Sequence, residues 1–240
     1  MLNYDKGRIA SGGLKVLRAD TSVSRVVSFI EKQLAAFSNK ELISSITNEK
    51  GLTQELCIFL TNHAKKENFP FMFEKEYMEE SEKGGSPQVD IGVIMIDSKC
   101  YGNRKSFFSI EAKRLSKISK AREKEYLVGR MEKGKYKQCG GVERFKKEIH
   151  GKGIKYGGMI GYLQEYDFDY WRYTINSWID ALIEGEIPTS AQWSENDKLT
   201  EEYKYSTTAK FVSENSRKTG SIILIHLWVN LINSKSEKIQ

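Results

Sequence analysis

The chain has 240 residues, of which 39% are hydrophobic and 29% charged, so its length and composition fit one soluble globular domain with its own core. Its formal net charge of +6 favours a polyanionic partner such as nucleic acid, because lysine and arginine side chains neutralise phosphates and release counterions. Its three cysteines are too scattered for a disulfide framework or a zinc site, and no signal peptide or membrane-spanning stretch is recognisable, so we expect a cytoplasmic protein with no membrane partner.

Two helices and three strands are predicted in the N-terminal half of the chain. Residues 1–20 are basic and contain several glycines, and we expect them to form a loose arm. Residues 21–37 open with residues typical of helix caps and repeat apolar residues at helical spacing, and a second helix is expected to begin near residue 47. Strand-like runs follow at 71–80, 88–97 and 107–115.

Alternation in the first two runs predicts which side chains share a face of the sheet. On the first run, three aromatic residues are expected on one side: Phe71, Phe73 and Tyr77. On the second, nearly continuous apolar run, four residues are expected on one face: Val89, Ile91, Val93 and Met95. Asp90 is predicted on the opposite face, where Gly92 leaves space beside the acid.

The C-terminal half predicts a further alternation of helices and strands. The charged segment 116–139 is expected to form exposed helix and loop, and 140–151 a short helix that ends at a glycine. The remaining elements are a buried strand at 157–165, an amphipathic helix at 169–185, and strands at 203–213 and 221–231. This order favours a single α/β domain over residues 1–240, with a central mixed β-sheet flanked by α-helices.

Two acids and one lysine form the pattern that is most informative about function. Glu111 and Lys113 lie two residues apart in a predicted strand, so both are expected on the face opposite Ile110 and Ala112. Asp90 is embedded in the preceding apolar strand, where a charged group is costly unless it binds something. If the two strands are hairpin partners, both carboxylates come within reach of one cation.

Phosphodiester hydrolysis needs the groups that this pattern supplies. Mg²⁺ prefers oxygen ligands such as carboxylates, and the bound metal acidifies a water and neutralises developing charge. A nearby ammonium stabilises that charge and orients the attacking hydroxide. The alternative for a Glu-x-Lys pattern is a solvated strand face or a local ion pair, since such short patterns are common by chance.

The residues around the acids resemble the PD-(D/E)XK nuclease superfamily, which includes restriction endonucleases and many phage-defence and repair nucleases. Asp90 in SPQVDIGV matches the first half of the family's motif, and Glu111 and Lys113 in FFSIEAKRL match the second half. The resemblance covers about residues 45–165 and implies a restriction-endonuclease-like core with an added N-terminal helix and an added C-terminal helix and strands. Two departures are Val89, which stands where the motif has proline, and the long spacing between the two acids, which requires a substantial hairpin loop.

The resemblance implies a role for each matched residue. In the family the acids bind Mg²⁺, for which Mn²⁺ substitutes, and the lysine assists the water. Asp90 and Glu111 are therefore the expected metal ligands, and Lys113 is the expected catalytic lysine. Family members often carry a further catalytic acid on the helix before the sheet. Glu49 is the candidate for that position, and Glu55 is the competing choice.

Basic residues near the motif are candidates for contact with a nucleic-acid backbone. They are Lys113, Arg114, Lys117, Arg144 and Lys147. The last two belong to a segment, 140–165, that resembles the helix and strand after the motif in bacterial defence-type members. A solvated helix face explains each basic residue equally well. Gln164 is expected to reach the active site, whereas the three histidines lack any metal-ligand spacing.

We therefore expect a metal-dependent endonuclease that hydrolyses phosphodiester bonds of DNA in preference to RNA, in prokaryotic genome or anti-phage defence. A helicase or ATPase partner that activates the enzyme would fit the lack of a recognisable target-recognition domain. A homodimer would suit double-strand cutting. The alternative, from another class of protein, is a non-catalytic DNA-binding or regulatory subunit with a nuclease-like fold.

Overall fold

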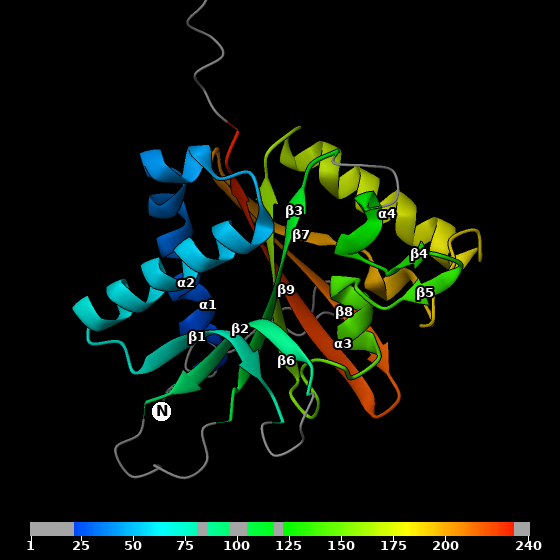
Figure 1. The fold of residues 1–240 in the computed structure, drawn as a ribbon, viewed down its shortest axis with the longest axis horizontal. Helices are drawn as coiled ribbons and strands as arrows, with labels where there is room; N and C mark the ends of the chain where they lie inside the picture. Colours follow the sequence, from blue (N-terminus) through cyan, green and yellow to red (C-terminus); the bar gives the residue numbers. More distant parts are fainter. Residues whose placement is uncertain (1–21, 81–85, 97–104, 118–121, 233–240) are drawn as a thin grey trace, which may run out of the picture.

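A mixed β-sheet separates two layers of helices (Figure 1). The structure, a computed structural model, describes residues 22–80, 86–96, 105–117 and 122–232, so the arm expected at residues 1–20 lies outside the described part. The helices are α1 (Ser22–Ser38), α2 (Glu49–Lys66), α3 (Gly141–Lys146) and α4 (Phe168–Ile183), with short 3₁₀ helices η1 (Glu41–Ser45), η2 (Glu123–Tyr126) and η3 (Glu195–Asp197). The strands are β1 (Phe71–Met78), β2 (Gln88–Met95), β3 (Phe108–Leu115), β4 (Arg130–Glu132), β5 (Lys135–Lys137), β6 (Tyr156–Leu163), β7 (Thr200–Lys204), β8 (Thr208–Arg217) and β9 (Gly220–Asn230).

The large sheet joins seven of the described strands in the order β1-β2-β3-β6-β9-β8-β7, and β4 pairs with β5 in a small separate sheet. The three central strands, β3, β6 and β9, pair in parallel, and the strands on either side of them pair antiparallel. Central strands are covered on both faces, which explains why the sequences of β6 and β9 are nearly continuous apolar runs. The expectation of an α/β fold with a central mixed sheet is confirmed.

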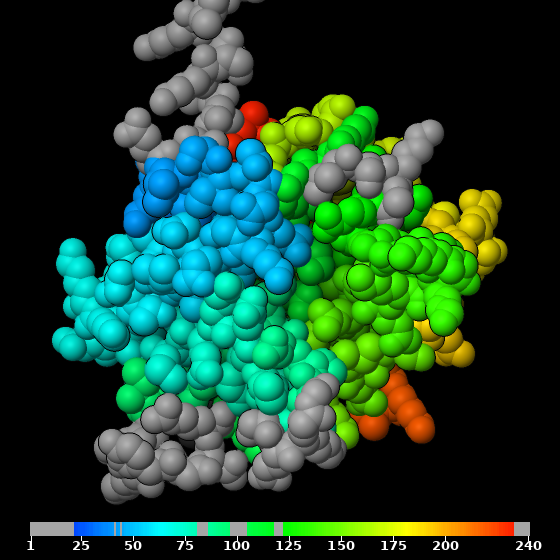
Figure 2. Space-filling view, viewed as in Figure 1, coloured from blue at the N-terminus to red at the C-terminus, as the bar shows by residue number. Residues whose placement is uncertain are grey.

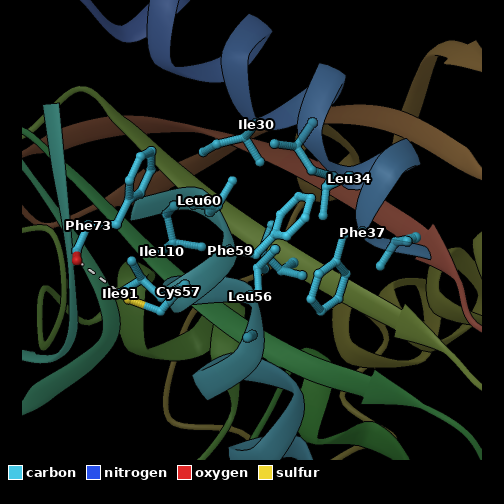
Figure 3. Close-up of a cluster of buried hydrophobic side chains, with 14 of the residues drawn as sticks. Ile30, Leu34, Phe37, Leu56, Cys57, Phe59, Leu60, Phe73, Ile91 and Ile110 are labelled. Atoms are coloured by element: carbon cyan, nitrogen blue, oxygen red, sulfur yellow. Dashed lines mark hydrogen bonds between the residues drawn. The ribbon is translucent and has the colours of Figure 1, made fainter. Parts of the chain in front are cut away.

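Helices α1 and α2 cover one face of the sheet. The side chain of Asn48 caps α2 by accepting a 2.7 Å hydrogen bond from the N–H of Gly51. Figure 3 shows the buried cluster beneath the two helices, which includes Ile30, Leu34, Phe37, Leu56, Phe59, Leu60, Phe73, Ile91 and Ile110. Full burial of one such side chain contributes roughly 1.5–3 kcal/mol. This layer therefore holds α2, and the Glu49 at its first position, firmly against the sheet.

Helices α3 and α4 pack on the opposite face of the sheet. Trp171 and Ile175 of α4 and Trp228 of β9 belong to this second cluster, and all three are at most 1% exposed. Gly161 of β6 lets the Trp228 ring approach the backbone, because a Cβ on Gly161 would lie 2.5 Å from Trp228 Cδ1. The two clusters together enclose β3 on both sides, so its charged residues lie in the interior of the molecule.

The segment between β3 and α3 departs from the exposed helix and loop expected at 116–139. Tyr126, Leu127 and Val128 are each at most 1% exposed, and the following residues form the β4–β5 hairpin. The Tyr126 hydroxyl lies 2.7 Å from Nδ1 of the buried His226. Three consecutive apolar residues therefore anchor a segment whose average composition is polar.

Two predicted boundaries in the C-terminal half also differ from the structure. The short helix expected at 140–151 ends at Lys146, and the residues after it form a turn in which Glu148 has a φ of +56°. The single strand expected at 203–213 is two strands, β7 and β8, which pair antiparallel with each other. The sequence pattern missed this hairpin because no glycine or proline marks its turn at 205–207.

β1 bends in the middle, and this bend changes the faces predicted for two strands. Glu76 has a φ of +51°, and it lies between Lys75, which pairs with Ile91, and Tyr77, which pairs with Val89. A positive φ is uncommon for such a residue and disturbs the regular alternation of side chains. Tyr77 and Val89 accordingly form a small cluster apart from the main core.

The second predicted face is thus only half correct. Ile91 and Val93 enter the core beneath α1 and α2, whereas Met95 is 48% exposed at the end of β2. The space expected beside Gly92 is filled by Tyr77, since a Cβ on Gly92 would lie 2.3 Å from Tyr77 Cγ.

Candidate active site

Asp90 and Glu111 lie where the pairing of β2 with β3 ends. Ile91 pairs with Ile110, and the next positions along the two antiparallel strands are Asp90 and Glu111. The N–H of Ala112 donates a 2.8 Å hydrogen bond to Asp90 Oδ2, which holds this carboxylate toward β3. The two strands are hairpin partners, and the acids become neighbours as the sequence argument required.

Lys113 lies among three carboxylates from three separate elements. Its Nζ is 3.1 Å from Glu111 Oε2, 3.4 Å from Glu49 Oε1 and 3.8 Å from Asp90 Oδ2. The side chain of Lys113 is 9% exposed and that of Glu111 is fully buried, so solvent screens their attraction weakly. The structure therefore brings together the four residues that the sequence singled out, around one buried ammonium.

Glu49 reaches the site because the start of α2 is tied to the ends of β3 and β6. The N–H of Arg114 donates to Glu49 Oε2 at 3.2 Å, and the Arg114 guanidinium donates to the carbonyl of Thr47. Gln164 donates to the carbonyl of Ile46 at 2.9 Å, so it fastens the segment before α2 and does not contact the acids. Glu55, the competing acid, makes no hydrogen bond or ion pair within the described residues.

The second oxygen of Glu111 is held by two residues of the connection between β3 and β6. Arg144 of α3 lies with Nη1 3.4 Å from Glu111 Oε1, and His150 lies with Nε2 3.0 Å from the same atom. His150 is fully buried, although its ring contacts lack the angles of hydrogen bonds. Arg144 was expected to contact a phosphate backbone, and the structure instead directs its guanidinium to Glu111.

Glu79, just after β1, supports His150 from the other side. Its Oε2 is 3.4 Å from His150 Nδ1, and its carboxylate accepts hydrogen bonds from the N–H of Gly151 and from the Ser109 hydroxyl. Glu79, His150 and Glu111 therefore form a row of ionisable groups, with the His150 ring between the two carboxylates. Sequence reasoning missed Glu79 and His150 because each is remote in the chain from the motif. Because β3 and β6 pair in parallel, the connection between them must cross a face of the sheet, and here it crosses the face that carries Glu111.

The charges of the site shift the pKa values of its members in opposite directions. Burial raises the pKa of Asp90 to about 7, and the neighbouring carboxylate of Glu111 adds to the rise. Burial alone would raise the pKa of Glu111, but Lys113, His150 and Arg144 together lower it to about 2. The pKa of Lys113 is raised because the surrounding acids outweigh its burial. Glu111 thus stays ionised at neutral pH, whereas Asp90 gains a proton readily.

The oxygen donors of this site fit a hard divalent cation. Three carboxylates face one ammonium, and the pKa of Asp90 is raised first by burial and then by the neighbouring charge of Glu111. A cation such as Mg²⁺ binds through one or two carboxylates and keeps several waters. Among the described residues no group of three or more His, Cys, Asp or Glu side chains is arranged to hold a metal ion, and the ammonium of Lys113 lies between the three acids.

The five basic residues expected to bind a backbone fall into two groups. Lys113, Arg114 and Arg144 contact protein groups inside the site. Lys147 is exposed and donates to the carbonyl of Ser190, and Lys117 is exposed at the end of β3. Figure 2 shows that the surface is hollowed between α2, coloured blue to cyan, and the green segment after β3.

No family model, curated protein or solved structure matches this chain. None of the helices in the described ranges has the length and apolar character needed to cross a membrane. The function must therefore be inferred from the geometry and charge of the site itself.

Proposed function

We propose that this protein is a metal-dependent endonuclease that hydrolyses phosphodiester bonds of DNA. The observation that carries the proposal is the convergence of Glu49, Asp90 and Glu111 on Lys113, all within 3.8 Å of its Nζ. The order α2-β1-β2-β3-α3-β6, with η2, β4 and β5 inserted before α3, spans the stretch of about residues 45–165 that resembles PD-(D/E)XK nucleases. We therefore also propose that the fold is a restriction-endonuclease-like core extended by α1, α4 and β7–β9.

Asp90 and Glu111 would hold Mg²⁺, or Mn²⁺ in its place. When bound, the metal supplies a water of lowered pKa and neutralises charge on the phosphate. The N–H of Ala112 donates to the Asp90 carboxylate and fixes its position. Glu111 is ionised at neutral pH because its pKa is lowered to about 2. Lys113, which stays protonated, donates toward the attacking water and the phosphate oxygens. Glu49 orients Lys113 by accepting from its ammonium.

Arg144 and His150 act as positioning residues in this scheme. Both lie against Glu111 Oε1, so they leave Oε2 directed to the side where Lys113 and Asp90 lie. A carboxylate whose two oxygens have separate partners cannot rotate freely. Arg144 and His150, which belong to the connection between β3 and β6, therefore set the orientation of the metal ligand Glu111 before any substrate binds.

One observation favours the second candidate, a non-catalytic DNA-binding or regulatory subunit. Lys113 already neutralises part of the charge of the acids, so the cluster is stable without a metal. Metal binding separates the two candidates, since a pure binding subunit has no need for Mn²⁺ at Asp90 and Glu111.

The test is cleavage of plasmid and single-stranded DNA by purified protein with Mg²⁺, with Mn²⁺ and with EDTA. Glu111→Gln preserves the shape of the side chain and removes its charge, and Glu186→Gln, in an exposed turn, is the matched control. We expect metal-dependent cleavage by the natural protein and by the control variant, and none by Glu111→Gln. Equal cleavage by Glu111→Gln would overturn the assignment of the site.

Calorimetric titration of Mn²⁺ on the same samples covers the case in which no protein cleaves DNA. Mn²⁺ binding that is lost in Glu111→Gln would support a nuclease activated by a partner, such as a helicase or an ATPase. Absence of Mn²⁺ binding in the natural protein would refute the nuclease and support the binding subunit. A role in prokaryotic genome or anti-phage defence, and a homodimer for double-strand cutting, belong to the same proposal and follow only if cleavage is found.

A further inference from the structure

Two tyrosines stack face to face at the start of α4. The rings of Tyr166 and Tyr170 have centroids 4.1 Å apart and an interplanar angle of 20°. Lys117 Nζ lies 4.6 Å from the Tyr166 centroid and 5.6 Å from the Tyr170 centroid. Because these two distances are similar, the ammonium lies beside the pair and not beyond the outer face of Tyr166. Tyr166 remains 43% exposed. We call Lys117, Tyr166 and Tyr170 the tyrosine platform.

Contacts with neighbouring residues, one of them the buried Trp171, hold the tyrosine platform in place. Trp171, which is 1% exposed, meets the Tyr170 ring at 90° and donates from its indole N–H to the carbonyl of Glu165 at 2.6 Å. A carboxylate oxygen of Glu165 accepts the N–H of Lys117 at 2.9 Å, which ties the end of β3 to the turn after β6. Asp167 caps α4 through the N–H of Tyr170.

Tyr166 itself has a φ of +57°. This conformation is a genuine outlier for a bulky residue, and such strain is concentrated at functional sites. An asparagine would adopt it more readily, and asparagine would also suit a turn before a helix. Among the five described non-glycine residues with a positive φ, Tyr166 alone carries an aromatic ring.

The tyrosine platform lies next to the C-terminal ends of β3 and β6, and β3 is the strand that carries Glu111 and Lys113. Leu115 of β3 pairs with Leu163 of β6, so both strands end together next to the turn that carries Tyr166. Lys117 follows Lys113 by four residues, so their Cα atoms are at most about 14 Å apart.

We propose that an unpaired base of a single-stranded nucleic acid stacks on Tyr166 while Lys117 contacts an adjacent phosphate. The inference rests on the proposed nuclease function, and it names the substrate as a strand with unpaired bases close to the scissile bond. Stacking on aromatic rings tolerates every base, and duplex DNA hides the faces of its bases. The platform therefore favours single-stranded DNA, or a frayed or flapped end, over an intact duplex.

The experiment measures binding without cleavage. Fluorescence anisotropy in EDTA compares a labelled oligothymidine with a blunt-ended duplex of two complementary strands, on the Glu111→Gln variant of the 240-residue chain. Tyr166→Asn removes the ring and suits the positive φ, Tyr166→Phe keeps a stacking ring, and Tyr173→Asn is the control. Tyr173 lies on α4, the helix that Tyr166 precedes, and is 77% exposed.

Tyr166→Asn is expected to weaken binding of the single strand by roughly 5- to 150-fold, the range given by loss of one stacked base. Tyr166→Phe and Tyr173→Asn are expected to bind as the parent protein does, and duplex binding is expected to change little. Lys117→Met should lower the dependence of log affinity on log salt by about 0.7, the contribution of one phosphate on a single strand.

Unchanged single-strand binding by Tyr166→Asn would overturn the proposal, as would equal loss in Tyr173→Asn or a larger loss on the duplex. Because the assay contains EDTA and a charge-removed Glu111, its outcome does not depend on cleavage. Ring-dependent binding by a protein that never cuts DNA would support the platform and count against the nuclease, so the two proposals fail separately.

Discussion

Replacing Asp90 by asparagine is expected to stabilise the metal-free protein. The pKa of Asp90 rises from an ordinary 3.8 to about 7 in the folded state, so the fold disfavours its ionised form. At 1.4 kcal/mol per pKa unit the full shift corresponds to about 4 kcal/mol above pH 7. The side chain is 30% exposed, and solvent screening reduces the expected gain to roughly 2–3 kcal/mol. Asparagine keeps an oxygen that accepts the N–H of Ala112.

The sign of the pH dependence follows from the raised pKa. A carboxyl group that holds its proton more tightly in the folded state stabilises the protein below pH 3.8, and this stabilisation is lost as the pH rises through 7. Urea unfolding in EDTA at pH 8.5 should therefore show Asp90→Asn above the natural protein by roughly 2–3 kcal/mol. At pH 5.5 about half of that difference should remain, and it should disappear only below pH 3.8. Asp180→Asn, on an exposed helix face, is the control and should change stability by less than about 0.5 kcal/mol.

A variant Asp90→Asn that is no more stable than the natural protein at pH 8.5 would refute this reasoning. The same holds for a stability difference that does not shrink at pH 5.5, because the effect would then not arise from the charge of Asp90. Mg²⁺ provides a further check: it should raise the stability of the natural protein more than that of the variant, since a ligand stabilises the state that binds it.

Burial lowers the pKa of His226 to about 3, below its ordinary 6.5. The free energy of unfolding should therefore fall by roughly 2–3 kcal/mol between pH 7 and pH 4.5, and urea unfolding of His226→Gln should lack this loss. Gly161→Ala would place a Cβ 2.5 Å from Trp228 Cδ1, and it should destabilise the protein by about 1–3 kcal/mol in thermal unfolding. Glu111→Ala leaves the buried ammonium of Lys113 without its nearest anion, and denaturant unfolding should show a loss of about 3–5 kcal/mol, more than for Glu111→Gln.

Each of these predictions has a definite contrary result. An acid slope that persists in His226→Gln would assign the loss to other groups. Unchanged stability of Gly161→Ala would show that the Trp228 ring moves away at little cost. A Glu111→Ala variant as stable as the natural protein would mean that Lys113 finds another partner or reaches solvent.

The sheet and the four central site residues could be predicted from sequence because both depend on local regularities. Alternation in β3 places Glu111 and Lys113 on one face, and a hairpin between consecutive strands is the simplest way to bring Asp90 beside them. The resemblance implies an acid on the helix before the sheet, and Glu49 is the candidate because it shares a helix face with Leu52 and Leu56. In the structure Glu49, and not Glu55, contacts Lys113.

The remaining features could not be predicted because they depend on backbone irregularity or on distant contacts. The positive φ of Glu76 leaves no mark in the hydrophobic pattern, yet it moves Tyr77 into the space beside Gly92. Likewise, His150 meets Glu79 only because the crossover before β6 passes over β3. Sequence spacing gives no measure of such a meeting, since the two residues are 71 positions apart.

The dependence of Glu111 on Arg144 and His150 has a consequence for the order of folding. Before the connection between β3 and β6 packs on β3, Lys113 alone balances the repulsion between the closely spaced acids Asp90 and Glu111 of the β2–β3 hairpin. Parallel pairing of β3 with β6 is a contact distant in sequence, and contacts of this kind form late because closing the loop costs entropy. We therefore expect the acids to reach their final arrangement in the last stage of folding, so that a partly synthesised or partly folded chain holds no competent site.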